Sequence, residues 1–172
     1  MSRAFPDFYK EFPNLNHFCF STNSVSFFER ILNYITIIDN TINHEGKIEI
    51  QFSFDGTDIT KKSRGIDPQI ILKNIESLFL GLNQIELKNV KVECHFHNVM
   101  TVELMKKLLN DDNEFFNFFD DIKNIIDKFQ SIIKNKNVSL WDYFSPGIIN
   151  PYNATVEDGK TFAKFYKKCI KF

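Results

Sequence analysis

Two histidines spaced two residues apart are the most chemically suggestive feature of the sequence. His95 and His97 close a stretch, 90–97, in which apolar and polar residues alternate. Alternate side chains of a β-strand point to the same face, so both rings are expected on one side of a sheet. A second alternating stretch, 47–54, could bring Glu49 beside them.

Two imidazoles and one carboxylate on a rigid sheet could hold a divalent metal. The sequence supplies no spaced third and fourth ligands, however, so we predict neither a metal nor another cofactor. The remaining interpretations are a solvated strand face or a polar sheet-face site. The residues predicted for that site are Glu49, Gln51, Glu93, His95 and His97.

Other catalytic arrangements lack their motifs. Cys19, Cys94 and Cys169 are widely spaced, and there is neither a CxxC pair nor a Gly-x-Ser-x-Gly nucleophile turn. Gly56 and Gly65 stand nine residues apart, which fits neither a Walker loop nor a dinucleotide-binding loop. The sequence therefore identifies no catalytic residue, and it favours a protein that is not an enzyme.

Acidic residues gather at the start of a predicted long helix and along one flank of it. Acids in a first helical turn are explained by the helix dipole, whereas those further along are not. The cluster is either a solvated helix face or a docking surface for a basic protein, because complementary charge speeds and orients encounter. The predicted partner-binding residues are Asp111, Asp112, Glu114, Asp120, Asp121 and Asp127.

These side chains need a sheet and helices to position them. Besides the two strands, apolar residues spaced three and four apart predict five helices. The helices are expected near residues 24–43, 68–80, 102–109, 114–134 and from about 155 onwards. Residues 55–67 and 138–153 are predicted loops, and residues 1–22 are an aromatic-rich N-terminal arm with a short extended piece near 17–20.

The alternation reverses just before the second strand. Ile85 and Leu87 are apolar at odd positions, whereas Val90 begins a run that is apolar at even positions. A slip of one residue turns every side chain of a strand to the other face. We therefore expect a β-bulge or a tight hairpin near residues 88–89.

The patterns together predict a single α+β domain with two layers. A small, mainly antiparallel sheet of two to four strands is expected, covered on one face by four to five amphipathic helices. The polar alternate positions argue against a doubly wound parallel sheet, whose central strands are buried on both faces.

Composition narrows the possible partners and location. The chain has 172 residues, a net charge of −1 and 43% hydrophobic residues, which indicates a globular protein with no special affinity for nucleic acid or an anionic membrane. No apolar run approaches the ~18 residues that span a bilayer, and the first residues lack an apolar signal segment. Three unpatterned cysteines suggest reduced thiols, so we expect a cytoplasmic protein.

Three functional hypotheses fit these observations. The first is a non-enzymatic protein that binds another protein, most concretely a bacterial immunity protein that neutralises a cognate toxin through a charged surface. The second is a small enzyme or a ligand or metal sensor that uses the polar sheet face around His95 and His97. The third is an oligomeric adaptor or chaperone that uses the long helix 114–134.

Overall fold

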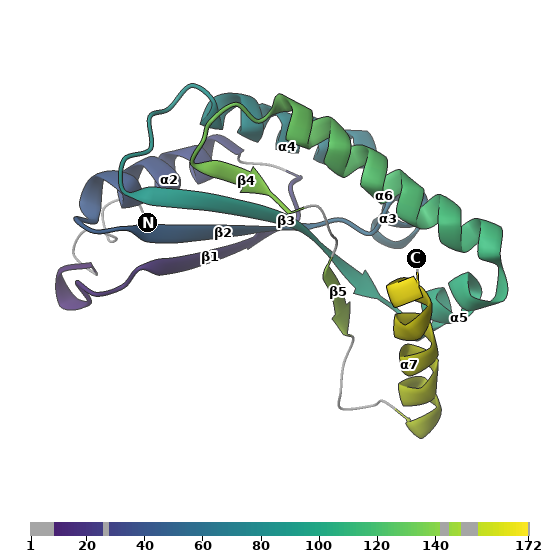
Figure 1. Cartoon of the computed structure of the whole chain (residues 1–172). Coiled ribbons are helices and arrows are strands. Elements are labelled where there is room, and N and C mark those ends of the chain that lie inside the picture. The colour runs from purple at the N-terminus through teal and green to yellow at the C-terminus, as the bar shows by residue number, and fades with distance from the viewer. Residues whose placement is uncertain (1–8, 26–27, 142–144, 149–154, 172) are drawn as a thin grey trace.

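All the strands in the described part of the chain run parallel to their neighbours (Figure 1). The structure is a computed structural model, and it describes residues 9–25, 28–141, 145–148 and 155–171. The strands, in their order across the sheet, are β1 (His17–Thr22), β2 (Gly46–Ser53), β3 (Val90–Met100) and β4 (Val138–Leu140). A fifth strand, β5 (Ser145–Ile148), pairs with the later part of β3.

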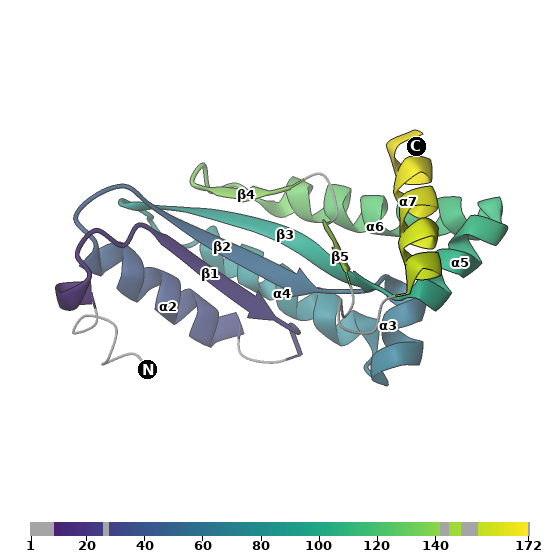
Figure 2. The same ribbon diagram turned by 90° about the horizontal axis from the view of Figure 1, so that it is seen from below.

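Three helices cover one face of this sheet, and three more lie toward the carboxyl ends of β2 and β3. The covering helices are α2 (Phe28–Thr41), α4 (Pro68–Leu82) and α6 (Asp112–Ile132). The others are α3 (Thr57–Arg64), α5 (Val102–Asn110) and α7 (Val156–Lys171). A helical turn at residues 9–11 precedes β1. Seen from below, the opposite sheet face carries no helix of the described chain (Figure 2).

The predicted α+β class with its mainly antiparallel sheet is therefore wrong, because the fold is α/β, and the predicted count of four to five helices is wrong as well. The sheet is parallel, and α3 forms inside the predicted loop 55–67. The physical reason lies in the connections. Crossovers between parallel strands are right-handed, and the strand order advances in one direction from β1 to β4, so every crossover helix falls on the same face. A parallel sheet can thus keep one polar face, so polar alternate positions do not exclude parallel strands.

The core lies between the sheet and its helix layer. Burial alternates along β2, as predicted, with Ile48, Ile50 and Phe52 fully buried. Aromatic rings connect the two layers: Phe79 of α4 lies 6.0 Å from Phe52 and 5.7 Å from Phe129 of α6, measured between ring centroids. Tilted and edge-on rings at such distances are favourable, so the core fixes the height of the helices above the sheet.

The reversal of the alternation before β3 has a different cause from the two that were predicted. The residues around it form a loop rather than a strand, hairpin or bulge. The carboxylate of Asp39, buried on α2, accepts hydrogen bonds from the backbone amides of Lys88, Asn89 and Val90 at 2.8 to 3.1 Å. These bonds satisfy amides that would otherwise lack partners, and they set the residue at which β3 begins.

Two helix starts agree with the sequence signals. Asp67 accepts a hydrogen bond from the amide of Gln69, and Pro68 occupies the first turn of α4. Before α7, Thr155 and Asp158 exchange backbone and side-chain hydrogen bonds, which is the capping-box arrangement. Capped starts fix where these helices begin relative to the sheet.

Candidate functional site on the open sheet face

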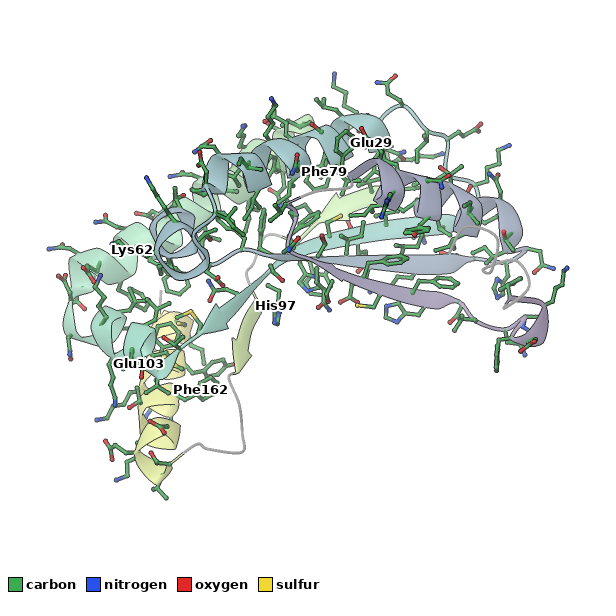
Figure 3. All side chains as sticks on the ribbon, turned by 180° about the vertical axis from the view of Figure 1, so that it is seen from behind. Glu29, Lys62, Phe79, His97, Glu103 and Phe162 are labelled. Carbon is green, nitrogen blue, oxygen red and sulfur yellow. The ribbon has the colours of Figure 1, made fainter. Side chains whose placement is uncertain are left out.

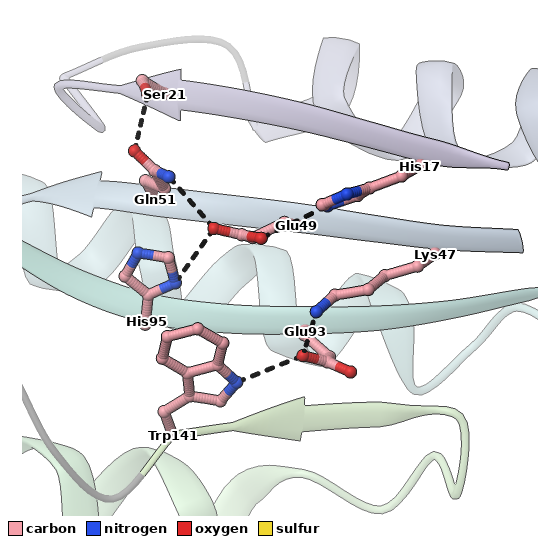
Figure 4. A network of polar contacts seen from close by, with 8 residues as sticks. All are labelled: His17, Ser21, Lys47, Glu49, Gln51, Glu93, His95 and Trp141. Carbon is pink, nitrogen blue, oxygen red and sulfur yellow. Dashed lines mark hydrogen bonds and ion pairs between the residues drawn. The ribbon is translucent and has the colours of Figure 1, made fainter. Parts of the chain in front are cut away.

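The odd-numbered residues within 17–21, 47–53 and 91–97, on β1, β2 and β3, place their side chains on the sheet face that no described helix covers. The strand register sets Cys19, Glu49 and Glu93 side by side, and in the next row Ser21, Gln51 and His95. Figure 4 shows that the polar side chains of these rows, together with Trp141, which follows β4, point toward one another across the strands. We call this surface the open sheet face.

Glu49 stands at the centre of the network. Gln51 Nε2 donates a hydrogen bond to Glu49 Oε1 at 3.0 Å, and Ser21 Oγ in turn donates to Gln51 Oε1 at 3.0 Å. His17 Nε2 lies 3.3 Å from the other oxygen, Glu49 Oε2. The hydrogen bond from Gln51 is the main cause that lowers the pKa of Glu49, with further contributions from His95, His17 and Lys47. Glu49 is therefore a carboxylate at neutral pH.

A second group of contacts pins the indole ring to the sheet. Lys47 Nζ lies 2.7 Å from Glu93 Oε2, and Trp141 Nε1 donates a hydrogen bond to the same oxygen at 3.3 Å. The lysine nitrogen also stands 5.8 Å from the centroid of the indole. The pKa of Glu93 is lowered, chiefly by its hydrogen bond with Lys47. Opposite charges and an aromatic ring are thus fixed within one cluster.

His95 lies beneath the indole. Its ring stacks on Trp141 with centroids 4.4 Å apart and planes 13° apart, and only 4% of its side chain is exposed. Burial lowers the pKa of His95 and outweighs the attraction of Glu49. The Nδ1 atom stands 3.8 Å from Glu49 Oε1, which is too long for a hydrogen bond. The ring is therefore neutral at neutral pH, and this contact becomes an ion pair only on protonation.

The geometry of the network suits neither a metal ion nor a nucleophile. His17 and His95 approach different oxygens of Glu49, and the described residues contain no group of three or more His, Cys, Asp or Glu side chains placed to hold a metal. Slight desolvation of the largely exposed thiol, together with the charge of Glu49, raises the pKa of Cys19, so this thiol stays protonated at neutral pH. What the site does offer is a set of fixed donors, acceptors and aromatic surface.

The structure brings four of the five predicted sheet-face residues together. Glu49, Gln51, Glu93 and His95 share the network, whereas His97 lies one step further along β3, opposite Ser53 and Ser145 (Figure 3). Sequence reasoning missed four members, which are His17, Ser21, Lys47 and Trp141. The alternation within 17–21 could have indicated the first two, once β1 was placed beside β2. Trp141 follows a strand of three residues and carries no periodic signal.

Most of the predicted acidic surface is occupied by contacts within the chain. Asp111 caps α6 by accepting hydrogen bonds from the amides of residues 113 and 114. Three other acids pair with lysines. These pairs are Asp112 with Lys168 at 2.6 Å, Glu114 with Lys107 at 2.8 Å, and Asp127 with Lys123 at 2.9 Å.

The last two acids, Asp120 and Asp121, point in different directions. Asp121 Oδ2 accepts hydrogen bonds from the amide and the hydroxyl of Thr57 at 2.9 and 2.7 Å, which holds the start of α3. Asp120 and Asp127 are seven residues apart and so share a helix face, about 100° away from Asp121. Residues 111–127 also extend over about 24 Å of helix axis. The acids do not form one compact patch.

Glu114 and Asp121 both line a hollow between α3, α5 and α6. It has a volume of about 920 Å³, and Lys62 and Lys107 line it as well. Its charges are therefore mixed rather than acidic. The two predicted surfaces differ accordingly: the sheet-face residues converge, and the acids of α6 disperse.

Comparisons with protein-family models, with curated proteins and with solved structures found no match for this chain. No helix in the described ranges is both long and apolar enough to cross a membrane. The fold defines an α/β protein whose parallel sheet is covered by helices on one side.

Proposed function

We propose that this chain is a non-enzymatic protein-binding protein that recognises its partner with the open sheet face. The observation that carries the proposal is the fixed polar and aromatic network on that face. Parallel sheets are normally covered on both sides. Here the described helices cover one side, and the other carries side chains already held in place by their neighbours. Such preorganised side chains lose little conformational entropy on binding.

The state of the potentially reactive groups favours binding over catalysis. The ring of His95 is shielded by Trp141, and the thiol of Cys19 is protonated at neutral pH. The groups that a partner can reach are recognition groups instead. His17 is 51% exposed and Lys47 is 36% exposed, and Trp141 is half-buried beside them. Aromatic side chains such as that of Trp141 are enriched at the centres of protein interfaces.

The partner class that we propose to test first is a toxin, which would make this chain an immunity protein. The open sheet face sets the ammonium of Lys47 against the carboxylate of Glu93, with the carboxylate of Glu49 nearby, so opposite charges lie close together on it. A surface of this kind selects a partner by matching the positions of charges rather than by net charge. This form of the proposal does not need the acids of α6, most of which are already paired.

The test is a calorimetric titration of the chain against the protein products of the genes beside its own. One of them is expected to bind with a Kd of about 10 nM or below. Lys47→Glu should weaken that complex by about tenfold or more, because it puts a third acid beside Glu49 and Glu93 in the centre of the interface. Lys123→Glu is the matched control, since that lysine also pairs with an acid but lies on α6.

The control should change the affinity by less than about twofold. Thermal unfolding of both variants establishes that each remains folded. The proposal fails if no neighbouring product binds with a Kd below about 1 µM, or if Lys123→Glu weakens the complex as much as Lys47→Glu does.

A further inference from the structure

The outer edge of β1 is an open strand edge in the described part of the chain. The amide of Lys47 donates to the carbonyl of Asn16 at 2.7 Å, which sets the phase of the ladder between β1 and β2. Successive residues of a strand direct their backbone groups to opposite sides. His17, Cys19 and Ser21 therefore present their N–H and C=O groups away from β2, and among the described residues no backbone group bonds to them.

This edge lacks the devices that usually protect a strand from pairing. Edge strands are commonly short, or they carry lysine, proline, an inward-pointing charge or a bulge. The opposite edge follows this rule, because β4 and β5 have three and four residues. By contrast, β1 has six residues, His-Phe-Cys-Phe-Ser-Thr, without a lysine, an acid or a proline. Its regular register with β2 shows no bulge.

We propose that two copies of this chain pair through β1, antiparallel, about a two-fold axis that passes beside Cys19. The strand is self-complementary in that arrangement: His17 faces Ser21 of the second copy, and Phe18 faces Phe20. Polar residues then meet on the open sheet face, aromatic residues meet on the helix side, and no like charges oppose each other.

A partly exposed aromatic side chain supports this arrangement. Phe20 remains partly exposed although it stacks on Tyr34 with centroids 6.3 Å apart, and a strand laid along β1 covers it further. A two-fold axis perpendicular to the sheet also keeps both helix layers on the same side. The two open sheet faces then become one continuous surface, and the dimer forms whatever that surface binds.

The first experiment measures the mass of the full chain by sedimentation equilibrium. The expected mass is twice the 20.3 kDa of one chain. Cys19→Lys should lower the measured mass to that of one chain, because it sets two like charges against each other at the two-fold axis. Cys19→Pro should do the same without added charge, because it removes the outward N–H. Ser139→Lys is the control on the opposite edge strand, where the side chain is also exposed, and it should stay dimeric.

Cysteine oxidation provides the second readout. Hydrogen-bonded residues in antiparallel strands have Cα atoms about 5.5 Å apart, which a disulfide can bridge. Mild oxidation should therefore link two chains in the wild type and in Cys169→Ser, but not in Cys19→Ser. Circular dichroism establishes that each variant is folded. A monomeric wild type overturns the proposal, and so does a dimer that persists in folded Cys19→Lys and Cys19→Pro.

Discussion

The open sheet face and the acidic flank of α6, residues 111–127, carry similar charged side chains but use them differently. On the sheet, Glu49 has contacts from β1, β2 and β3 at once, and 15% of its side chain is exposed. On α6, Asp127 meets one lysine in a pair whose members are 55% and 65% exposed. Exposed pairs of that kind contribute about 0 to 1 kcal/mol. The charged groups on the sheet thus hold several strands together, whereas most of those on α6 contribute little to stability.

The difference comes from the geometry of the two elements. A helix turns by about 100° per residue, so acids adjacent in sequence spread around its axis and along its length. Parallel strands do the opposite, because residues distant in sequence share one row when their register matches. Cys19, Glu49 and Glu93 stand side by side although about 75 residues separate the first from the last. Polar side chains on several strands therefore make a denser site than a sequence cluster on one helix.

The largest expected effect in this comparison is that of Trp141→Ala. The substitution removes the ring that stacks on His95 and the donor to Glu93, and it exposes the imidazole to water. We expect a loss of about 2 to 3 kcal/mol in the free energy of unfolding, below the range for fully buried tryptophan because this one is half-buried. Urea unfolding followed by circular dichroism measures it. A loss below about 0.5 kcal/mol would mean that the indole, like the exposed charges of α6, contributes little to stability.

Glu49→Ala should have the next largest effect. It leaves Gln51 Nε2 without its acceptor and removes the carboxylate beside His17 and His95. A loss of about 1 to 2 kcal/mol in the free energy of unfolding is expected. Asp127→Ala is the matched control, an acid truncated in the same way on α6, with an expected loss below about 0.5 kcal/mol. Equal losses in the two variants would contradict the contrast between the surfaces.

Asp121 is the exception on the acidic flank, and it sharpens the comparison. Its carboxylate takes two donors from Thr57 and so holds another element, the start of α3. Asp121→Ala should lower the free energy of unfolding by about 1 kcal/mol, as the loss of a helix cap does. Its neighbour Asp120→Ala should change it by less than about 0.5 kcal/mol. Hydrogen exchange of the α3 amides should speed up in the first variant alone.

Local patterns in the sequence specify much of this fold, but not its connections. The alternation of 47–54, the proline start of α4 and the apolar stripe of α6 each appear in the structure at the expected place. Strand direction does not follow from such patterns, because alternation reports that one face is polar and not which way the neighbouring strand runs. The connections decide that: α2 and α4 return the chain to the end of the sheet where the preceding strand began, so the next strand runs parallel to it.

The same limit applies to the candidate site. Residues on the two alternating strands could be predicted, since period two alone places Glu49 and His95 on one face. Lys47 needs the register between strands, and Trp141 needs the path of the chain after α6, so neither has a local signal. The Asp39 carboxylate that binds the amides of residues 88–90 is a contact across about 50 residues. It explains why the reversed alternation could not be interpreted from its own neighbourhood.

The smallest expected effect is a change in how stability depends on pH. Burial lowers the pKa of His95 below its ordinary value of 6.5, so the unfolded chain binds this proton more readily than the folded protein does. The neutral His95 therefore makes its full contribution to stability above about pH 6.5. That contribution is lost as the pH falls from there through the lower pKa that His95 has in the folded protein. His95→Phe keeps a ring against Trp141 but cannot titrate, so its unfolding free energy should fall less between about pH 7 and pH 5. Glu49 loses its charge only below its ordinary value of 4.5, because its pKa is also lowered, and that loss stays outside this range. Equal slopes in the wild type and in His95→Phe would show that the ring is not shielded, and the open sheet face would then resemble α6 in this respect.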